Sequence, residues 1–117
     1  MVVLMKSVCV PKDQDALIRL DYNENKPGDL LEVILDDQDF EKLWQSGFFN
    51  SINVLAHSMI DIFENENISE SKKLESVINS DLFQNSKYDE NIFKIVRKIE
   101  ELFKEALHRN TGIHFYF

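Results

Sequence analysis

The strongest pattern in the sequence is an apolar stripe with helical spacing between residues 89 and 108. Its apolar residues recur at intervals of three and four, which places them along one side of a helix. They are Ile92, Ile95, Val96, Ile99, Leu102, Phe103 and Ala106. The pattern predicts the longest helix of the chain, with this side facing the core.

The first third of the chain has the composition of β-strands. Residues 2–10 are mostly apolar and β-branched, and residues 16–22 alternate so that four apolar side chains share one face. Pro27-Gly28 suits the centre of a type II turn, and the β-rich segment 30–35 follows it. These features predict three strands, of which the second and third form a hairpin.

From residue 36 onward the spacing of apolar residues becomes helical. Aspartates at positions 36, 37 and 39 predict the start of a short helix over residues 40–45, and Gly47 suits its left-handed end. A second helix is expected from about residue 51 to 63, ended by the polar residues 65–67. Either Asn67 or Ser69 suits the cap of a third helix that includes Leu74 and Leu82.

The closing segment 113–117 alternates again and predicts a strand. Ile113, Phe115 and Phe117 share one face, which must be buried by pairing with the N-terminal sheet, in the same chain or across a dimer. The expected fold class is α+β: a small, mostly antiparallel sheet, made of the N-terminal strands plus the C-terminal strand, with about four helices packed on one face. We expect one domain over residues 1–117, with a β-rich acidic part (1–36), a helical part (37–110) and the strand (111–117).

The charge of the chain is unevenly distributed. Of 21 acidic residues, against 13 basic ones, ten lie between Asp13 and Glu41, where only Arg19 and Lys26 are basic. A nucleic-acid binder needs a basic face, so the charge argues against direct nucleic-acid binding and favours a basic protein partner. Cys9 is the lone cysteine, which favours a reducing, cytoplasmic setting, and no apolar run approaches the roughly 20 residues of a membrane span.

The sequence contains little that could form an active site. His57 and Asp61 could be one helical turn apart, but no nucleophile accompanies them in a recognisable motif. The acidic residues from Asp37 onward resemble a calcium loop only at its start, because its sixth and twelfth positions hold Lys42 and Phe48. With three glycines the chain has no nucleotide-binding motif. We expect no enzyme activity, no cofactor and no metal site.

The acidic cluster has two interpretations: a solvated surface that maintains solubility, or a recognition face for Lys and Arg side chains. In the second interpretation Tyr22 or Trp44 would anchor the centre, although core packing is expected for most of the aromatic side chains near Trp44. The candidate partner-binding residues are Asp21, Tyr22, Glu24, Asp29, Asp36, Asp37, Asp39, Glu41 and Trp44.

Several segments resemble small acidic immunity proteins, the inhibitors found in bacterial contact-dependent growth inhibition and related polymorphic toxin systems. They are Leu43-Trp44-Gln45-Ser46-Gly47-Phe48-Phe49, Ile52-Asn53, Ile60-Asp61, Phe63-Glu64 and Thr111-Gly112-Ile113-His114-Phe115-Tyr116-Phe117. The resemblance implies a cytoplasmic protein that binds and neutralises a cognate toxin domain, in many cases a basic nuclease. We expect the chain to be a monomer or weak dimer. The alternative is an adaptor or regulatory domain that binds another protein through its near-neutral helical side.

Overall fold

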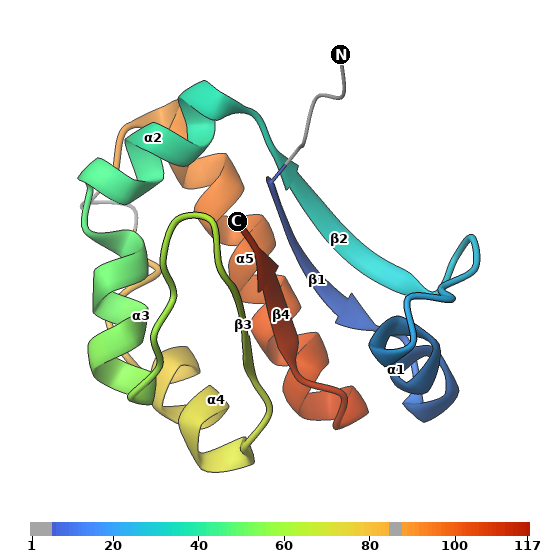
Figure 1. Cartoon of the computed structure of the whole chain (residues 1–117). Helices are drawn as coiled ribbons and strands as arrows, with labels where there is room; N and C mark the ends of the chain where they lie inside the picture. The colour runs from blue at the N-terminus through green and yellow to red at the C-terminus, as the bar shows by residue number, and fades with distance from the viewer. Residues whose placement is uncertain (1–5, 85–87) are drawn as a thin grey trace.

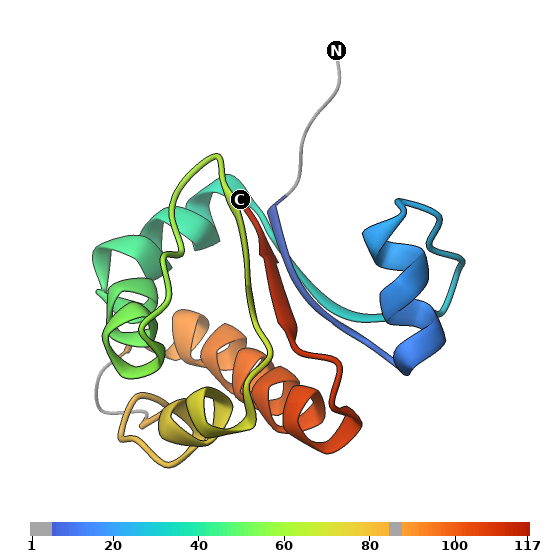
Figure 2. The same ribbon diagram turned by 60° about the horizontal axis from the view of Figure 1, so that its bottom comes forward.

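An antiparallel sheet of four strands separates a single short helix on one side from the other helices on the opposite side (Figures 1 and 2). The computed structural model describes residues 6–84 and 88–117. The strands are β1 (Lys6–Pro11), β2 (Leu30–Leu35), β3 (Asn65–Ile68) and β4 (Ile113–Tyr116), in the order β2-β1-β4-β3. The helices are α1 (Gln14–Asp21), α2 (Asp37–Gln45), α3 (Phe48–Ala56), α4 (Ser71–Ile78) and α5 (Glu90–Arg109).

This architecture confirms the α+β class. The described residues form five helices rather than about four, and they do not all pack on one face. Helices α2 to α5 cover one side of the sheet, whereas α1 lies on the opposite side (Figure 2). We call the first side the helix-covered face and the second the open face.

Strand β4 joins the two halves of the sheet. It pairs with β1, where Val8 lies opposite Phe115, and with β3, where Ile68 lies opposite Ile113. The expected addition of the closing segment to the N-terminal sheet is therefore confirmed, within the chain. Ile113 and Phe115 are fully buried on the helix-covered face, as the alternation predicts.

The predicted long helix is α5, displaced by one residue from the expected bounds. Its stripe lies in the core, where Val96, Ile99 and Phe103 have no exposed surface. Asp89 caps the helix, with one carboxylate oxygen accepting a hydrogen bond of 2.9 Å from the amide of Ile92. A strong stripe and a capping carboxylate thus locate this helix almost completely.

Residues 16–22 do not form a strand, although their alternating pattern predicts one. Asp13, which the sequence suggests as part of a turn, is instead a helix cap whose carboxylate accepts a 2.8 Å hydrogen bond from the Ala16 amide. Ala16 is fully buried while Ile18 is 54% exposed, so these side chains do not share a buried strand face. Strand β2 therefore pairs with β1 rather than with residues 16–22, and the predicted hairpin of the second and third strands is wrong.

The second helix is shorter than its stripe suggests. Helix α3 ends at Ala56, and His57 adopts a left-handed conformation with φ of 51°. The Asn53 side chain then holds the returning chain, because it accepts hydrogen bonds from Ile60 N at 2.7 Å and Ser58 Oγ at 2.8 Å. Ile60 is buried without being helical, and residues 65–68 form β3 instead of a polar helix end.

The remaining differences concern boundaries. Helix α2 begins at Asp37, with Asp36 as its cap, and Gly47 ends it with φ of 83° as expected. Helix α4 starts after Glu70, so neither Asn67 nor Ser69 caps it, and Leu82 lies beyond its last residue. The first predicted strand agrees with β1, but its residues 2–5 lie outside the described part of the chain.

Candidate functional site

The predicted partner-binding residues form two groups at opposite ends of β2. Asp21, Tyr22 and Glu24 lie in and after α1, near the start of the strand, whereas the carboxylates of residues 36–41 lie at α2, beyond its end (Figure 1). A strand of six residues spans about 20 Å, so the acidic segment is not one compact cluster. The exposed Glu32 on β2 lies between the groups.

Asp29 is buried and already paired, so it is not accessible to a partner. Its side chain accepts two hydrogen bonds of 2.7 Å from the Arg19 guanidinium and one of 2.8 Å from Lys26 N. These donors hold the pKa of the Asp29 carboxyl well below its usual range. Asp29 therefore fastens α1 to the turn before β2, and it is a structural residue rather than part of the predicted interface.

Two further predicted residues have structural roles in the α2 region. The Asp36 carboxylate accepts a 2.8 Å hydrogen bond from Asp39 N and caps the helix. Trp44 is half-buried, with its ring 5.8 Å from the rings of both Phe40 and Phe49. The side chain of Asp37, by contrast, is 96% exposed and is free to meet a partner apart from a distant contact with Lys6.

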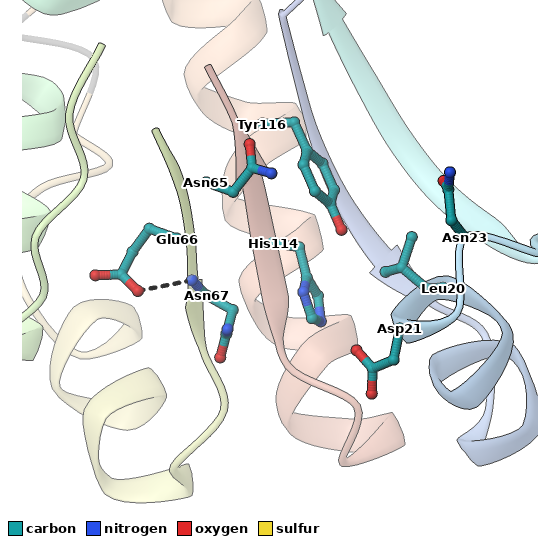
Figure 3. Close-up of a pocket in the computed structure, with 8 residues that line it drawn as sticks. All are labelled: Leu20, Asp21, Asn23, Asn65, Glu66, Asn67, His114 and Tyr116. Atoms are coloured by element: carbon teal, nitrogen blue, oxygen red, sulfur yellow. Dashed lines mark hydrogen bonds between the residues drawn. The ribbon is translucent and has the colours of Figure 1, made fainter. Parts of the chain in front are cut away.

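Tyr22 and Glu24 follow α1 and are accessible. Tyr22 is 73% exposed, whereas the other tyrosine and tryptophan side chains of the described residues are half-buried, and Glu24 is also exposed. Asp21 precedes them at the end of α1 and faces the open side of the sheet (Figure 3). The α1 group thus retains all three of its predicted binding residues at the surface.

A cleft of about 500 Å³ lies between α1 and the open face of the sheet (Figure 3). It is lined mainly by polar side chains from α1 and the turn after it, from β3 and from β4. They are Asp21, Asn23, Asn65, Asn67, His114 and Tyr116, with Leu20 and Glu66 completing the wall. Asp21 is the only one of the predicted binding residues in this cleft.

His114 is neutral near pH 7. Its burial lowers its pKa below the ordinary 6.5, and this effect outweighs the neighbouring Thr111 carbonyl and Asp21, which both act to raise it. Nε2 lies 3.2 Å from the Thr111 carbonyl oxygen, which can only accept a hydrogen bond, so Nε2 carries the proton. Nδ1 of the neutral ring is then a hydrogen-bond acceptor.

Tyr116 and the carboxylates determine the sign of the charge in the cleft. Burial raises the pKa of Tyr116 to about 12, so its hydroxyl stays protonated. Glu66 is occupied by hydrogen bonds of 2.9 Å from Met59 N and Asn67 N, whereas Asp21 has no such partner in the described residues. The lining, as far as the structure describes it, includes no Lys or Arg, so the cleft is acidic.

The remaining candidates for chemistry are poorly placed. His57 ends α3 and Asp61 lies outside any helix, so the two are not on one helical turn as the sequence suggests. Cys9 is 1% exposed, and burial raises the pKa of its thiol to about 12, which disfavours the nucleophilic thiolate. Within residues 6–84 and 88–117, no three metal-ligating side chains are grouped closely enough to hold an ion.

Most residues of this cleft are not among the binding residues predicted from the sequence. The alternation at residues 113–117 places His114 and Tyr116 on the face opposite the core, and that polar, aromatic face was a usable indication. Asn65 and Asn67 give no comparable indication, because their polar character also fits the end of a helix.

Comparisons with protein-family models, with curated proteins and with solved structures found no match to this chain. None of the helices that the structure describes has the length and apolar character needed to cross a membrane.

Proposed function

We propose that this chain is a non-enzymatic immunity protein that binds and neutralises a cognate bacterial toxin domain. The partner we infer is a basic nuclease domain, bound in the cytoplasm by a chain that acts as a monomer or weak dimer. The observation that carries the proposal is the set of exposed carboxylates on and just after α1, on β2 and on α2, among them Asp21, Glu24, Glu32, Asp37 and Glu41. The resemblance of several segments to small acidic immunity proteins supports the same function.

The carboxylates suit such a partner for an electrostatic reason. A nuclease needs a cationic surface to bind nucleic acid, and exposed carboxylates of the inhibitor are complementary to that surface. Opposite charges also speed the encounter, which is useful for an inhibitor that must act before the toxin does. The separation of the two acidic groups by about 20 Å favours contact along an extended surface rather than at one point.

A survival assay tests the proposal directly. Bacteria express the toxin domain encoded immediately upstream, with or without this chain. Death without the chain and growth with it would support the immunity function. A lethal domain that this chain fails to neutralise would contradict the immunity function. A harmless upstream domain would also contradict it, because there would be no toxin for the chain to neutralise.

The acidic surface is tested by paired substitutions with matched charge. Asp37→Asn with Glu41→Gln removes two charges near α2 without touching the cap residue Asp36, and Asp21→Asn with Glu24→Gln does so near α1. Each pair should weaken toxin binding on the order of tenfold and reduce its dependence on salt. Glu75→Gln with Glu101→Gln, on α4 and α5, removes the same charge and should leave binding unchanged.

A second candidate function is the adaptor that binds through its helical side. The observation in its favour is the exposure of three apolar side chains on and after α3: Val54 (76%), Met59 (78%) and Phe63 (88%). Exposed apolar groups of this kind are common at protein-binding sites. The adaptor function predicts that Phe63→Ser abolishes partner binding while both acidic pairs leave it unchanged, the reverse of the immunity function.

A further inference from the structure

We propose that the cleft between α1 and the open face of the sheet is a binding site for a guanidinium group, supplied by an arginine side chain of the protein partner. The inference rests on the proposed function only for the source of the arginine. The chemistry of the site follows from its lining, which is acidic, rich in hydrogen-bond acceptors and partly aromatic.

The charge of the cleft selects a cation. Asp21 contributes a carboxylate that no described donor occupies, and His114 is neutral near pH 7. Within the described lining there is no Lys or Arg to neutralise Asp21. An anionic ligand would therefore meet an unpaired carboxylate, while a cation would form a charge-assisted hydrogen bond with it.

The polar groups of the cleft can serve several donors at once. The side chains of Asn65 and Asn67 make no hydrogen bond within the described part of the chain, so their carbonyl oxygens are available as acceptors. Nδ1 of His114 is another acceptor, on the strand next to them. A guanidinium carries five N–H donors in a fixed plane and needs acceptors on more than one side, which this arrangement supplies from α1, β3 and β4.

The aromatic side chains favour guanidinium over ammonium. His114 and Tyr116 lie two residues apart on β4, with their ring planes only 11° from parallel and their centroids 6.5 Å apart. Both point from the strand toward α1, where the Asp21 carboxylate faces the His114 ring (Figure 3). A planar guanidinium can stack on such a ring while it bonds a carboxylate at its edge, whereas a lysine ammonium is a compact point charge that gains less from the flat surface.

The cleft is also large enough to admit an extended side chain. A volume of about 500 Å³ lies within the range of about 300–1,000 Å³ that is typical of small-ligand sites. The cleft is partly open to solvent, as a site for a side chain projecting from another protein must be.

The test is an NMR titration of the full ¹⁵N-labelled chain with N-acetyl-arginine amide. The expected result is saturable shifts at residues of the cleft, chiefly His114, Tyr116 and the two asparagines of β3. N-acetyl-lysine amide should bind several-fold more weakly, and the neutral N-acetyl-citrulline amide should bind about tenfold more weakly than the arginine compound.

Two variants with identical net charge make the test specific. Asp21→Asn should weaken binding of the arginine compound by about tenfold, because it removes the carboxylate partner. Asp15→Asn removes one charge from the first turn of the same helix, outside the cleft lining, and should leave binding within twofold of the original chain. Native-like ¹⁵N spectra of both variants establish that each remains folded.

The outcomes separate this inference from the proposed function. If the arginine compound leaves the cleft unperturbed, binds no better than citrulline, or loses equal affinity in both variants, the guanidinium site is wrong. If the guanidinium site is wrong but the chain protects cells in the survival assay, the immunity function is still supported. Binding of arginine in the cleft, with no protection against a toxin domain that kills, would overturn the immunity function and support the site.

Discussion

The two faces of the sheet are made from alternate residues of the same strands, yet they differ in almost every property. On the helix-covered face Val8, Ile113 and Phe115 have no exposed surface, and they pack against the stripe of α5. On the open face the same strands present His114 and Tyr116, both only half-buried, and a polar cleft. The short helix α1 is the one described element that packs over that side (Figure 2).

The difference shows how a small domain separates stability from recognition. Burial of apolar and aromatic side chains on one face supplies most of the free energy of folding. The open face contributes less to stability and can therefore present charged and polar groups to a partner. Strand β4 serves both purposes, because its odd-numbered residues point into the core and its even-numbered residues line the cleft.

The largest expected effect comes from a substitution on the helix-covered face. Phe49 is fully buried and lies 4.9 Å from Phe117 and 5.3 Å from Phe48, measured between ring centroids. Phe49→Ala should reduce the free energy of unfolding by about 3–5 kcal/mol, because it leaves a cavity among aromatic rings. Urea denaturation measures this.

The substitution on the open face that we compare with Phe49→Ala is Ile34→Thr. Ile34 is 47% exposed, and threonine preserves its β-branching, so stability should change by no more than about 0.5 kcal/mol. A similar loss for both variants would show that the two faces do not differ as described.

An effect smaller than that of Phe49→Ala is expected where Asp29 links α1 to the rest of the fold. Asp29→Asn removes the partner of Arg19, so amide hydrogen exchange in α1 should accelerate while exchange in α5 stays unchanged. The pKa of Asp29 is lowered in the folded chain, so its stabilisation is present above the ordinary 3.8 and is lost as the pH falls below that value. The difference in urea midpoint between variant and original chain should therefore be largest near pH 7 and narrow in acid.

Equal acceleration of exchange in α1 and α5 would contradict this prediction. It would mean that the Asp29 contacts stabilise the whole domain rather than the single helix on the open face.

The smallest expected effect concerns the protonation of His114. Asp21 acts to raise the pKa of His114, so Asp21→Asn should lower that pKa further below 6.5, as followed by NMR of the imidazole signals. Because the folded pKa is depressed, the unfolded chain binds the proton first, and stability declines as the pH falls from 6.5 toward the native value. An unchanged pKa in the variant would show that Asp21 does not act on the cleft side of β4.

The helix-covered face could be predicted from the sequence better than the open face. The stripe of α5 and the alternation of residues 113–117 are signatures of burial, and both were correct. The strand predicted over residues 16–22 is wrong because the alternation of these residues also fits a helix in which Ala16 is buried. Whether the segment forms a strand or a helix depends on the cap formed by Asp13. The bend after α3 is not predicted because it depends on two hydrogen bonds between the Asn53 side chain and the backbone of Ile60, seven positions away.

The cleft was harder to predict than the fold for a similar reason. The charge pattern alone indicates Asp21, while His114 and the asparagines of β3 come together only through the pairing of β3 with β4. Asp29 has the same charge as its neighbours in sequence, and only its contact with Arg19 distinguishes it as a structural residue. A pattern of residue types along the chain records burial, but it does not record which polar side chains meet.

The position of β4 between β1 and β3 has a consequence during protein synthesis. Every other element that the structure describes leaves the ribosome before this strand, yet β1 and β3 have no contact in the sheet except through it. The nascent chain can therefore form helices and the β1–β2 ladder early, but not the complete sheet. The cleft, which needs His114 and Tyr116, can form only after β4 has been synthesised, so a chain truncated before residue 113 would lack it.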